Sequence, residues 1–364
     1  MSQSGWVPSL PDPVLQLMTQ QHGVGTMRQL AEAGFSERRA ATALRNGHLV
    51  RLHRGAYALS EQWSAASGST RHCMRLLAVQ IAAPDAVGWA QTAVVGWGLS
   101  VRELPALPKV VRLGGAATAV GAVNSRADVS RDQVVLHRDL RLVDKSRAVV
   151  ETAASSDLCG GLITADSALR DGLPLESLLT VAGSRASSRG RRQLRRTLLA
   201  ADPGSESWLE SLSRGRVLEV GLPMPLCNVE LHHLGRTVRC DLLWGEEGVV
   251  GECDGKGKYA DGRTAATVIW REKRRHEWIE SLGFEVARWG YPEVADDGMA
   301  VLARVERARA IQRGAGFRWP EAVTARVVLP PAVPPLDRVV EEVKRLRSRG
   351  VRLTLVTAGG RRVA

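Results

Sequence analysis

Three acidic side chains, Asp241, Glu252 and Asp254, fall within one short stretch of the chain, residues 237–259. Close carboxylates repel one another, and hard divalent cations such as Mg²⁺ prefer carboxylate oxygens as ligands. Lys258 follows the acids, and a lysine can stabilise the charge that develops on a phosphate during attack. These groups are those that metal-assisted hydrolysis of a phosphodiester requires. The pattern predicts a Mg²⁺ or Mn²⁺ site, and the alternative is a hairpin with ordinary surface acids.

Two strands joined by a tight turn are predicted to position these acids. Apolar and β-branched residues dominate 237–244 and 249–254, and Gly-Glu-Glu-Gly at 245–248 is a turn signal. A turn centred on Glu246-Glu247 places two polar pairs on one face, Asp241 opposite Glu252 and Arg239 opposite Asp254. The other face is apolar and is expected to be core, with Val238, Cys240, Leu242 and Trp244 against Gly255, Cys253, Gly251 and Val249. Without a cation, one of the acids is expected to titrate above its ordinary value.

The hairpin lies within a longer α-β-β-β-α-β series. The predicted elements are a helix over 208–220, a strand over 227–231, the two hairpin strands, a helix over 264–282 and a strand over 284–289. Glu210 lies in the first turn of the first helix. Glu272 and Arg275 fall on the buried stripe of the second helix. They form either a satisfied ion pair or, with Arg239, a group that surrounds and orients the carboxylates.

Residues 10–65 are predicted to form a winged helix-turn-helix. Helices over 13–21, 27–33 and 37–46, with Thr26 and Ser36 as caps of the second and third, precede two short strands around Arg54. One side of the third helix collects donors for phosphates and base edges, Arg38, Arg39, Thr42, Arg45 and Asn46. The opposite side is alanine and leucine. We expect these donors and Arg54 to contact DNA, although a solvated surface helix shows the same division and small winged domains also bind proteins.

The composition favours an intracellular protein with a polyanionic partner. The net charge is +12 and the pI is about 10.2. The five cysteines form no C-x-x-C pair and are odd in number, which indicates reduced thiols and argues against a disulfide framework or a zinc site. No apolar run reaches about 18 residues and no signal-peptide pattern is present. We expect a cytoplasmic protein without membrane contact.

The remaining segments carry little chemistry. Residues 71–200 are predicted to form an α/β middle domain, in which His137, Asp144 and Asp166 are interpreted as surface or capping residues. Residues 185–196 contain six arginines and no acid, which suits either phosphate binding or a solvated linker. After a proline-rich spacer, residues 330–364 are treated as a C-terminal tail.

Two parts of the chain resemble known families. The predicted element order, the acids Asp241 and Glu252-x-Asp254, the pair Lys258-Tyr259 and the stretch EKRRHEWIESLGFEVARW resemble the PD-(D/E)xK nuclease superfamily over 205–295. Within it, the similarity is to the branch related to very-short-patch-repair endonucleases. The stretch GTMRQLAEAGFSERRAATALRNGHLVRLHRGAYAL resembles the winged-helix domain of AbiEi-family antitoxins of type IV toxin–antitoxin systems, and this resemblance covers about 1–200.

The nuclease resemblance implies a restriction-endonuclease-like fold with Glu210, Asp241 and Glu252 as metal-binding acids, to which the residues themselves add Asp254. The family expects a lysine two positions after Glu252, where this chain has Asp254. Either Lys258 or Lys256 replaces that amine, or catalysis is altered or lost.

We therefore expect an α/β multidomain DNA-binding protein with a metal-dependent endonuclease-like domain, linked to toxin–antitoxin systems or phage defence. The alternative is a non-enzymatic AbiEi-like antitoxin and transcriptional repressor. In that case the nuclease fold is degenerate and binds DNA or a partner such as a cognate toxin.

Overall fold

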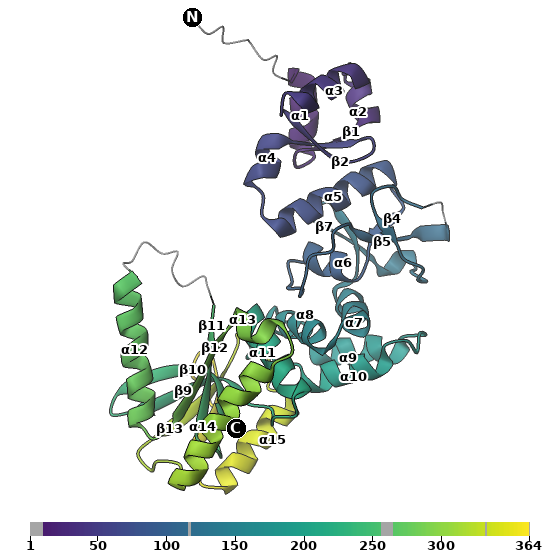
Figure 1. Ribbon diagram of the computed structural model, residues 1–364. Helices are drawn as coiled ribbons and strands as arrows, with labels where there is room; N and C mark the ends of the chain where they lie inside the picture. Colours follow the sequence, from purple (N-terminus) through teal and green to yellow (C-terminus); the bar gives the residue numbers. More distant parts are fainter. Residues whose placement is uncertain (1–9, 116–117, 256–264, 332, 364) are drawn as a thin grey trace, which may run out of the picture. The chain divides into compact units, whose positions relative to one another are not determined.

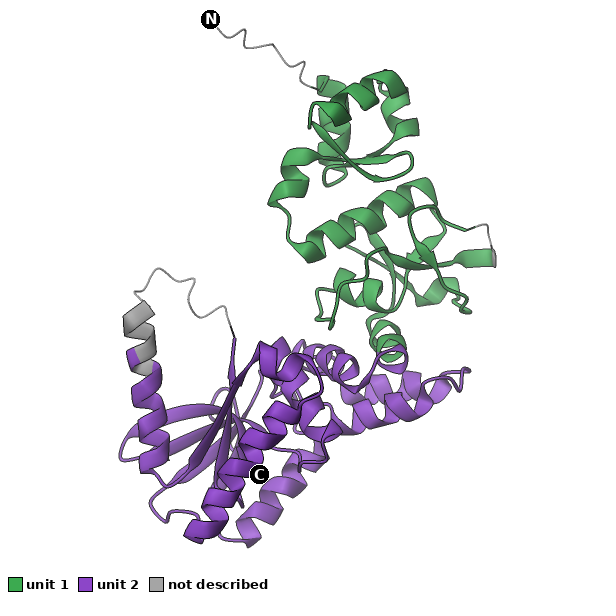
Figure 2. Ribbon diagram, in the orientation of Figure 1, with its two compact units in different colours: residues 1–152 green, residues 153–364 purple. Residues whose placement is uncertain are grey.

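The computed structural model describes residues 10–115, 118–255, 265–331 and 333–363, and describes only the backbone at 115, 265–269 and 271. The chain divides into two units, residues 1–152 and 153–364 (Figures 1 and 2). The boundary falls inside residues 71–200. The segment expected as one middle domain is therefore divided between the two units.

The first part of unit 1 has the element order of a winged helix-turn-helix. Its elements are α1 (Asp12–Gln20), β1 (Val24–Thr26), α2 (Met27–Glu32), α3 (Glu37–Arg45), β2 (Leu49–His53) and β3 (Ala56–Leu59). The strands form an antiparallel sheet in the order β1-β3-β2. Thr26 caps α2 in a capping box with Gln29, and Ser36 Oγ accepts a hydrogen bond from the Arg39 amide. The predicted helices and caps are confirmed, and only the three-residue β1 was not expected.

The second part of unit 1 is a five-stranded sheet with short helices. The elements are α4 (Ser60–Ala65), α5 (Gly68–Ala82), β4 (Ala86–Gly88), α6 (Gln91–Gly96), β5 (Lys109–Arg112), the 3₁₀ turns η1 (Leu113–Gly115) and η2 (Arg131–Gln133), β6 (Val123–Asn124), β7 (Val134–His137) and β8 (Leu140–Val143). The strand order is β6-β5-β4-β8-β7. The buried residues of α5 include Leu76 and Val79, and those of β4 and β8 include Val87 and Leu142.

Unit 2 begins with helices and continues into a six-stranded sheet. The helices are α7 (Lys145–Ser155), which crosses the boundary, α8 (Leu158–Arg170), α9 (Leu175–Ser184), α10 (Arg191–Ala200) and α11 (Trp208–Glu219). There follow β9 (Leu226–His233), β10 (Arg236–Trp244), β11 (Val249–Asp254), α12 (Ala265–Ser281), β12 (Glu285–Gly290), α13 (Tyr291–Ala295), α14 (Met299–Ala315), β13 (Thr324–Leu329), α15 (Asp337–Ser348) and β14 (Leu353–Thr357). From α11 to β12 this is the predicted order α-β-β-β-α-β.

The sheet of unit 2 extends beyond the predicted domain. Its strand order is β12-β11-β10-β9-β13-β14, with β13 antiparallel to β9 and β14 parallel to β13. Residues 330–364, treated as a tail from the sequence, contribute α15 and the edge strand β14. A fragment that ended at residue 295 would lose two hydrogen-bonded strands of this sheet.

Helices cover both faces of the sheet and form two separate cores (Figure 1). Ile279 of α12 and Val343 of α15 pack in one core with Val229. Leu212 of α11 and Val305 of α14 pack in the other core with Leu242. Because both faces are buried, the strands read as continuous apolar runs interrupted by a few polar residues.

β10 changes faces at Asp241. Cys240 belongs to the core beneath α12 and α15, whereas Leu242, two residues on, belongs to the core beneath α11 and α14. Opposite Asp241, between the flanking pairs of the β9–β10 ladder, Asn228 has a φ of 54°. A residue in this left-handed region interrupts the regular alternation of side chains along a strand.

The predicted apolar face of the hairpin is therefore wrong. The four residues expected on one face divide between the two cores, Val238 and Cys240 in one and Leu242 and Trp244 in the other. Cys253 lies in the core that Cys240 does not share, so these cysteines are not a packed cross-strand pair.

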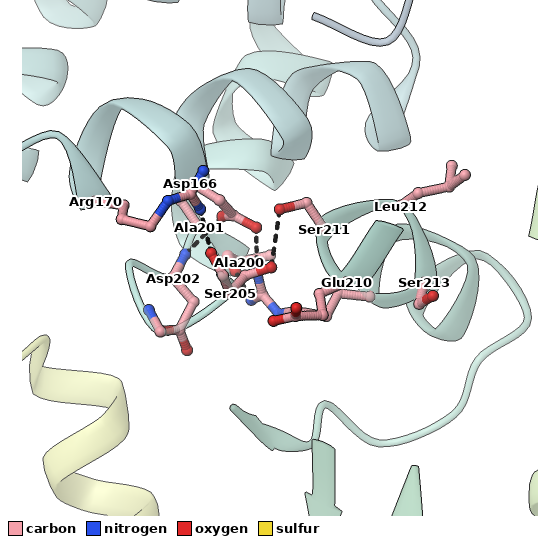
Figure 3. A network of polar contacts seen from close by, with 12 residues as sticks. Asp166, Arg170, Ala200, Ala201, Asp202, Ser205, Glu210, Ser211, Leu212 and Ser213 are labelled. Carbon is pink, nitrogen blue, oxygen red and sulfur yellow. Dashed lines mark hydrogen bonds and ion pairs between the residues drawn. The ribbon is translucent and has the colours of Figure 1, made fainter. Parts of the chain in front are cut away.

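A buried polar network joins α8 to α11 (Figure 3). Arg214 and Asp166 form an ion pair at 2.5 Å with both side chains fully buried. Arg214 also donates to the Ala200 carbonyl, and the other Asp166 oxygen accepts from the Asp202 amide at 2.7 Å. Asp166 is thus not the surface or capping residue that the sequence indicated. The network fixes the start of α11, because Ser205 and Ser211 bond to each other beside it at 2.9 Å.

We predict that Asp166→Ala lowers the free energy of unfolding of unit 2 by about 3–5 kcal/mol, because it leaves the buried Arg214 charge without its partner. Urea unfolding of the full chain measures this loss. Glu321→Ala removes an exposed carboxylate from the same unit and is the control, with an expected change within about 0.5 kcal/mol. Equal effects of the two substitutions would contradict this role of the network.

Candidate functional site

The hairpin has the predicted register over the three pairs nearest its turn, whereas the expected pairs of Asp241 with Glu252 and of Arg239 with Asp254 are not part of the ladder. Leu242, Leu243 and Trp244 pair with Gly251, Val250 and Val249. Gly248 has a φ of 63°, a conformation that favours glycine at the turn. One position beyond Leu242 the ladder ends, and the Asp241 carboxylate accepts a hydrogen bond from the Cys253 amide at 2.8 Å. The Asp241 side chain therefore continues the hydrogen bonding between the two strands beyond the last main-chain pair.

Carboxylates from both helical layers meet at this end of the ladder. Glu210 of α11 and Asp241 of β10 line a cavity of about 350 Å³ together with Glu206, Arg239, Glu272 and Arg275. Glu252 lies beside it and is 2% exposed. The side chains of α11 and α12 enter opposite cores, so the face change at Asp241 is what lets their polar residues meet.

Two of these acids hold their protons more tightly than usual. Burial raises the pKa of Glu210 to about 7, and the nearby Asp241 carboxylate adds to the increase. Burial also raises the pKa of Glu252 to about 7, again with a contribution from Asp241. The expected upward shift is present, but loss of solvation is the largest cause and repulsion between carboxylates is smaller.

An arginine supplies the cation that the sequence assigned to a metal ion. Arg275 Nη1 donates to Glu252 Oε2 at 2.5 Å, and Nη2 donates to Oε1 at 2.8 Å. The same guanidinium donates to the Arg239 carbonyl and lies 3.7 Å from Glu272. This fork-to-fork geometry matches both oxygens of one carboxylate. Arg275 thus forms the predicted pair with Glu272 and also neutralises Glu252.

Asp254, Glu272 and Glu206 also have arginine partners within the chain. Asp254 pairs with Arg288 of β12 at 3.1 Å, and Arg288 donates to Glu272 at 2.6 Å. Arg239, expected opposite Asp254, instead donates to Glu206 and Asn228. Arg288 was not expected near the acids, and the signal for it in the sequence is a single arginine in the apolar strand FEVARW. The pairing needs the parallel β11–β12 register, which places Arg288 beside Glu252.

The described carboxylates do not fit a divalent metal ion as they are arranged. Both oxygens of Glu252 are bonded to Arg275, and one oxygen of Asp241 is bonded to a main-chain amide. Among the residues that the structure describes, no group of three or more His, Cys, Asp and Glu side chains is placed to hold a metal. Lys256 and Lys258, the candidate catalytic amines, lie outside the described residues.

The winged-helix part presents the predicted donor surface. On α3, Arg38, Arg39 and Arg45 are exposed, as is Asn46 at its C-cap, while Thr42 is partly exposed. Arg45 Nη2 donates to Thr42 Oγ1 at 3.0 Å, and Arg39 lies over the Phe35 ring. The opposite side of α3 is buried through Ala40 and Ala43.

The wing adds to this surface. Arg54 is exposed in the turn between β2 and β3. The donors of α3 and Arg54 are both presented by elements that pack on one small apolar core.

We predict that the stability of unit 2 falls as the pH rises from about 4.5 to about 7. In this window folded Glu210 keeps a proton that the unfolded chain has released, so ionisation favours unfolding. Glu210→Gln removes this titration and should make the decline shallower. Thermal unfolding at several pH values measures it, with Glu321→Gln as an exposed control that keeps the wild-type slope. If Glu210→Gln kept the wild-type dependence of stability on pH, the raised pKa of Glu210 would be refuted as its cause.

Comparison with known proteins finds a family match for the N-terminal part of the chain. Residues 12–60 match the sequence model of a family described as "Transcriptional regulator, AbiEi antitoxin". A search of curated proteins finds no match to the chain. In the part of the chain that the structure describes, no helix is long and apolar enough to cross a membrane. Residues 12–60 are therefore similar to a family of AbiEi antitoxin transcriptional regulators.

Proposed function

We propose that this chain is a DNA-binding transcriptional regulator of the AbiEi antitoxin type, which reads DNA through α3 of its winged helix. The observation that carries the proposal is the exposed donor surface of α3 within the segment that matches the regulator family. Arginine, asparagine and threonine can bond both phosphates and base edges in the major groove. The buried alanines behind them hold the helix on its core, so the donors are presented by a rigid element.

The charge of the chain suits this role. A net charge of +12 attracts a polyanion at long range. The arginines of α3 place part of this positive charge on the surface that would contact DNA. An antitoxin of this kind would also bind a cognate toxin protein, and its partner surface lies outside the donor face of α3 in this proposal.

We predict that the double substitution Arg38→Gln and Arg45→Gln weakens binding to duplex DNA and lowers the slope of log K against log salt by about two, one for each lost phosphate contact. Fluorescence anisotropy across a salt series measures both quantities. Arg131→Gln removes an exposed arginine from another part of unit 1 and is the control. Unchanged affinity and slope in the double variant would favour a protein-binding role for the winged helix.

Metal-dependent cleavage of DNA by unit 2 is the second candidate function. It is supported by the convergence of Glu210, Asp241 and Glu252 at the end of the hairpin ladder. The bidentate pairing of Glu252 with Arg275 opposes it, because both oxygens of that carboxylate already accept hydrogen bonds from a positive charge. We therefore rank cleavage below a regulator whose nuclease-like unit has lost its catalytic arrangement.

A plasmid assay separates the two candidates. Supercoiled DNA is incubated with the full chain in Mg²⁺ or Mn²⁺, and Asp241→Asn serves as the matched variant with nearly the same shape. We expect intact plasmid with both proteins. Nicking by the wild type that Asp241→Asn abolishes would establish the endonuclease and displace the regulator-only assignment.

A further inference from the structure

A second concave surface of unit 2 is lined by arginines and shares no lining residue with the carboxylate cavity. It has a volume of about 460 Å³ and lies where β13 and β14 begin and α15 ends. Its polar lining residues are Thr324, Arg326, Arg347, Arg352, Thr354 and Arg362. None of the residues that line it is acidic.

The register of the sheet brings these side chains together. Arg326 of β13 is beside Thr354 of β14, and Ala325 is beside Leu353. Ala325 and Leu353 are buried in the core, so Arg326 and Thr354 point to the opposite, accessible face. Thr324 and Arg352 are exposed one step earlier along the two strands.

Two further segments complete the lining of the cavity. Arg347, in the last turn of α15, is fixed by its Nε, which donates to the Leu353 carbonyl at 2.5 Å. Arg362 is brought back by a bridge with Val356, and the Val363 amide bonds the Leu355 carbonyl at 2.8 Å. The four guanidinium groups therefore come from segments that tertiary structure alone brings into one place.

Three arginines of this cavity, Arg326, Arg352 and Arg362, differ from several other arginines of unit 2, which pair with acids. Arg309, Arg338 and Arg345 each pair with a carboxylate at 2.5–2.7 Å. In the described parts of the chain, no ion pair involves Arg326, Arg352 or Arg362. The nearest acid by register is Glu230, which faces Arg326 across the β9–β13 pair and lies 3.4 Å from His232.

The lining specifies the chemistry of a ligand. Guanidinium groups and threonine hydroxyls donate to phosphate oxygens, and arginine does so in a bidentate manner. The volume is that of a site for an extended ligand and exceeds what one phosphate ion fills. No aromatic side chain lines the cavity to stack on a base. These features favour the sugar–phosphate backbone of a nucleic acid over a free nucleotide.

We propose that this cavity, the Arg326 cavity, binds the phosphate backbone of DNA without reading its sequence, as a second contact besides the winged helix. The binding depends on neither the regulator assignment nor any cleavage by unit 2. It gives the chain a non-specific contact whose affinity falls with salt.

The experiment uses the full chain carrying Arg38→Gln and Arg45→Gln, so that the winged helix contributes little. Binding of random-sequence duplex DNA is measured by anisotropy across a salt series. Adding Arg326→Gln and Arg352→Gln should weaken binding and lower the log–log salt slope by about two. Arg318→Gln with Arg361→Gln removes two exposed arginines that do not line the cavity and should change neither quantity.

A second variant tests the same cavity without removing arginine. Thr324→Glu places a negative charge on the lining at an exposed position and should also weaken DNA binding. Thermal unfolding of all variants checks that the fold is kept. Equal DNA binding by the cavity variants and the Arg318/Arg361 control would overturn the proposal. So would loss of binding to inorganic phosphate or to polyglutamate with DNA binding unchanged, because the site would then serve a small anion or an acidic protein.

Discussion

Buried carboxylates that lie close together need a cation, and this requirement organises unit 2. Glu252 is almost fully buried beside Asp241, and the Arg275 guanidinium bonds both of its oxygens. The side chain of Arg275 reaches Glu252 only if α12 packs along the sheet, which its Ile279 and Leu282 achieve in the core. Charge compensation and apolar packing thus favour the same position for α12. Loss of either would destabilise unit 2, because a buried Glu252 without its arginine partner is unfavourable.

The break in β10 explains why polar groups meet in a sheet with two buried faces. A regular strand would send Asp241 to one core, whereas the positive φ of Asn228 opposite it ends the alternation there. Glu210 then approaches from the α11 side and Arg275 from the α12 side. The buried Arg214–Asp166 pair holds α11 against α8, so the position of Glu210 depends on a second internal ion pair. In this site, arginines of the chain pair with four of the acids, Glu206, Glu252, Asp254 and Glu272.

The arginines of this chain serve two distinct purposes. Arg214, Arg275 and Arg288 pair with acids inside unit 2. The exposed arginines Arg38 and Arg45 of α3, and Arg326 and Arg352 of the Arg326 cavity, pair with no acid in the described residues and can neutralise phosphates. The excess of 50 basic over 38 acidic residues therefore acts at surfaces, where it suits a DNA-binding regulator better than an enzyme with a charged catalytic cleft.

Local sequence determined the winged helix, because its helices are short-range structures with their own caps. Thr26 and Ser36 mark helix starts, and the 100° spacing of α3 separates Arg38 and Arg45 from Ala40 and Ala43. The hairpin register near the turn also followed from its symmetric sequence.

Tertiary structure alone decided the rest. Arg275 and Arg288 reach the acids through helix packing and a parallel strand pair, β14 joins the sheet from far along the chain, and Asp166 is buried by α11. Contacts between residues distant in sequence leave no periodic pattern, so the sequence could indicate that Arg275 lies near the carboxylates but could not show that it bonds both oxygens of Glu252.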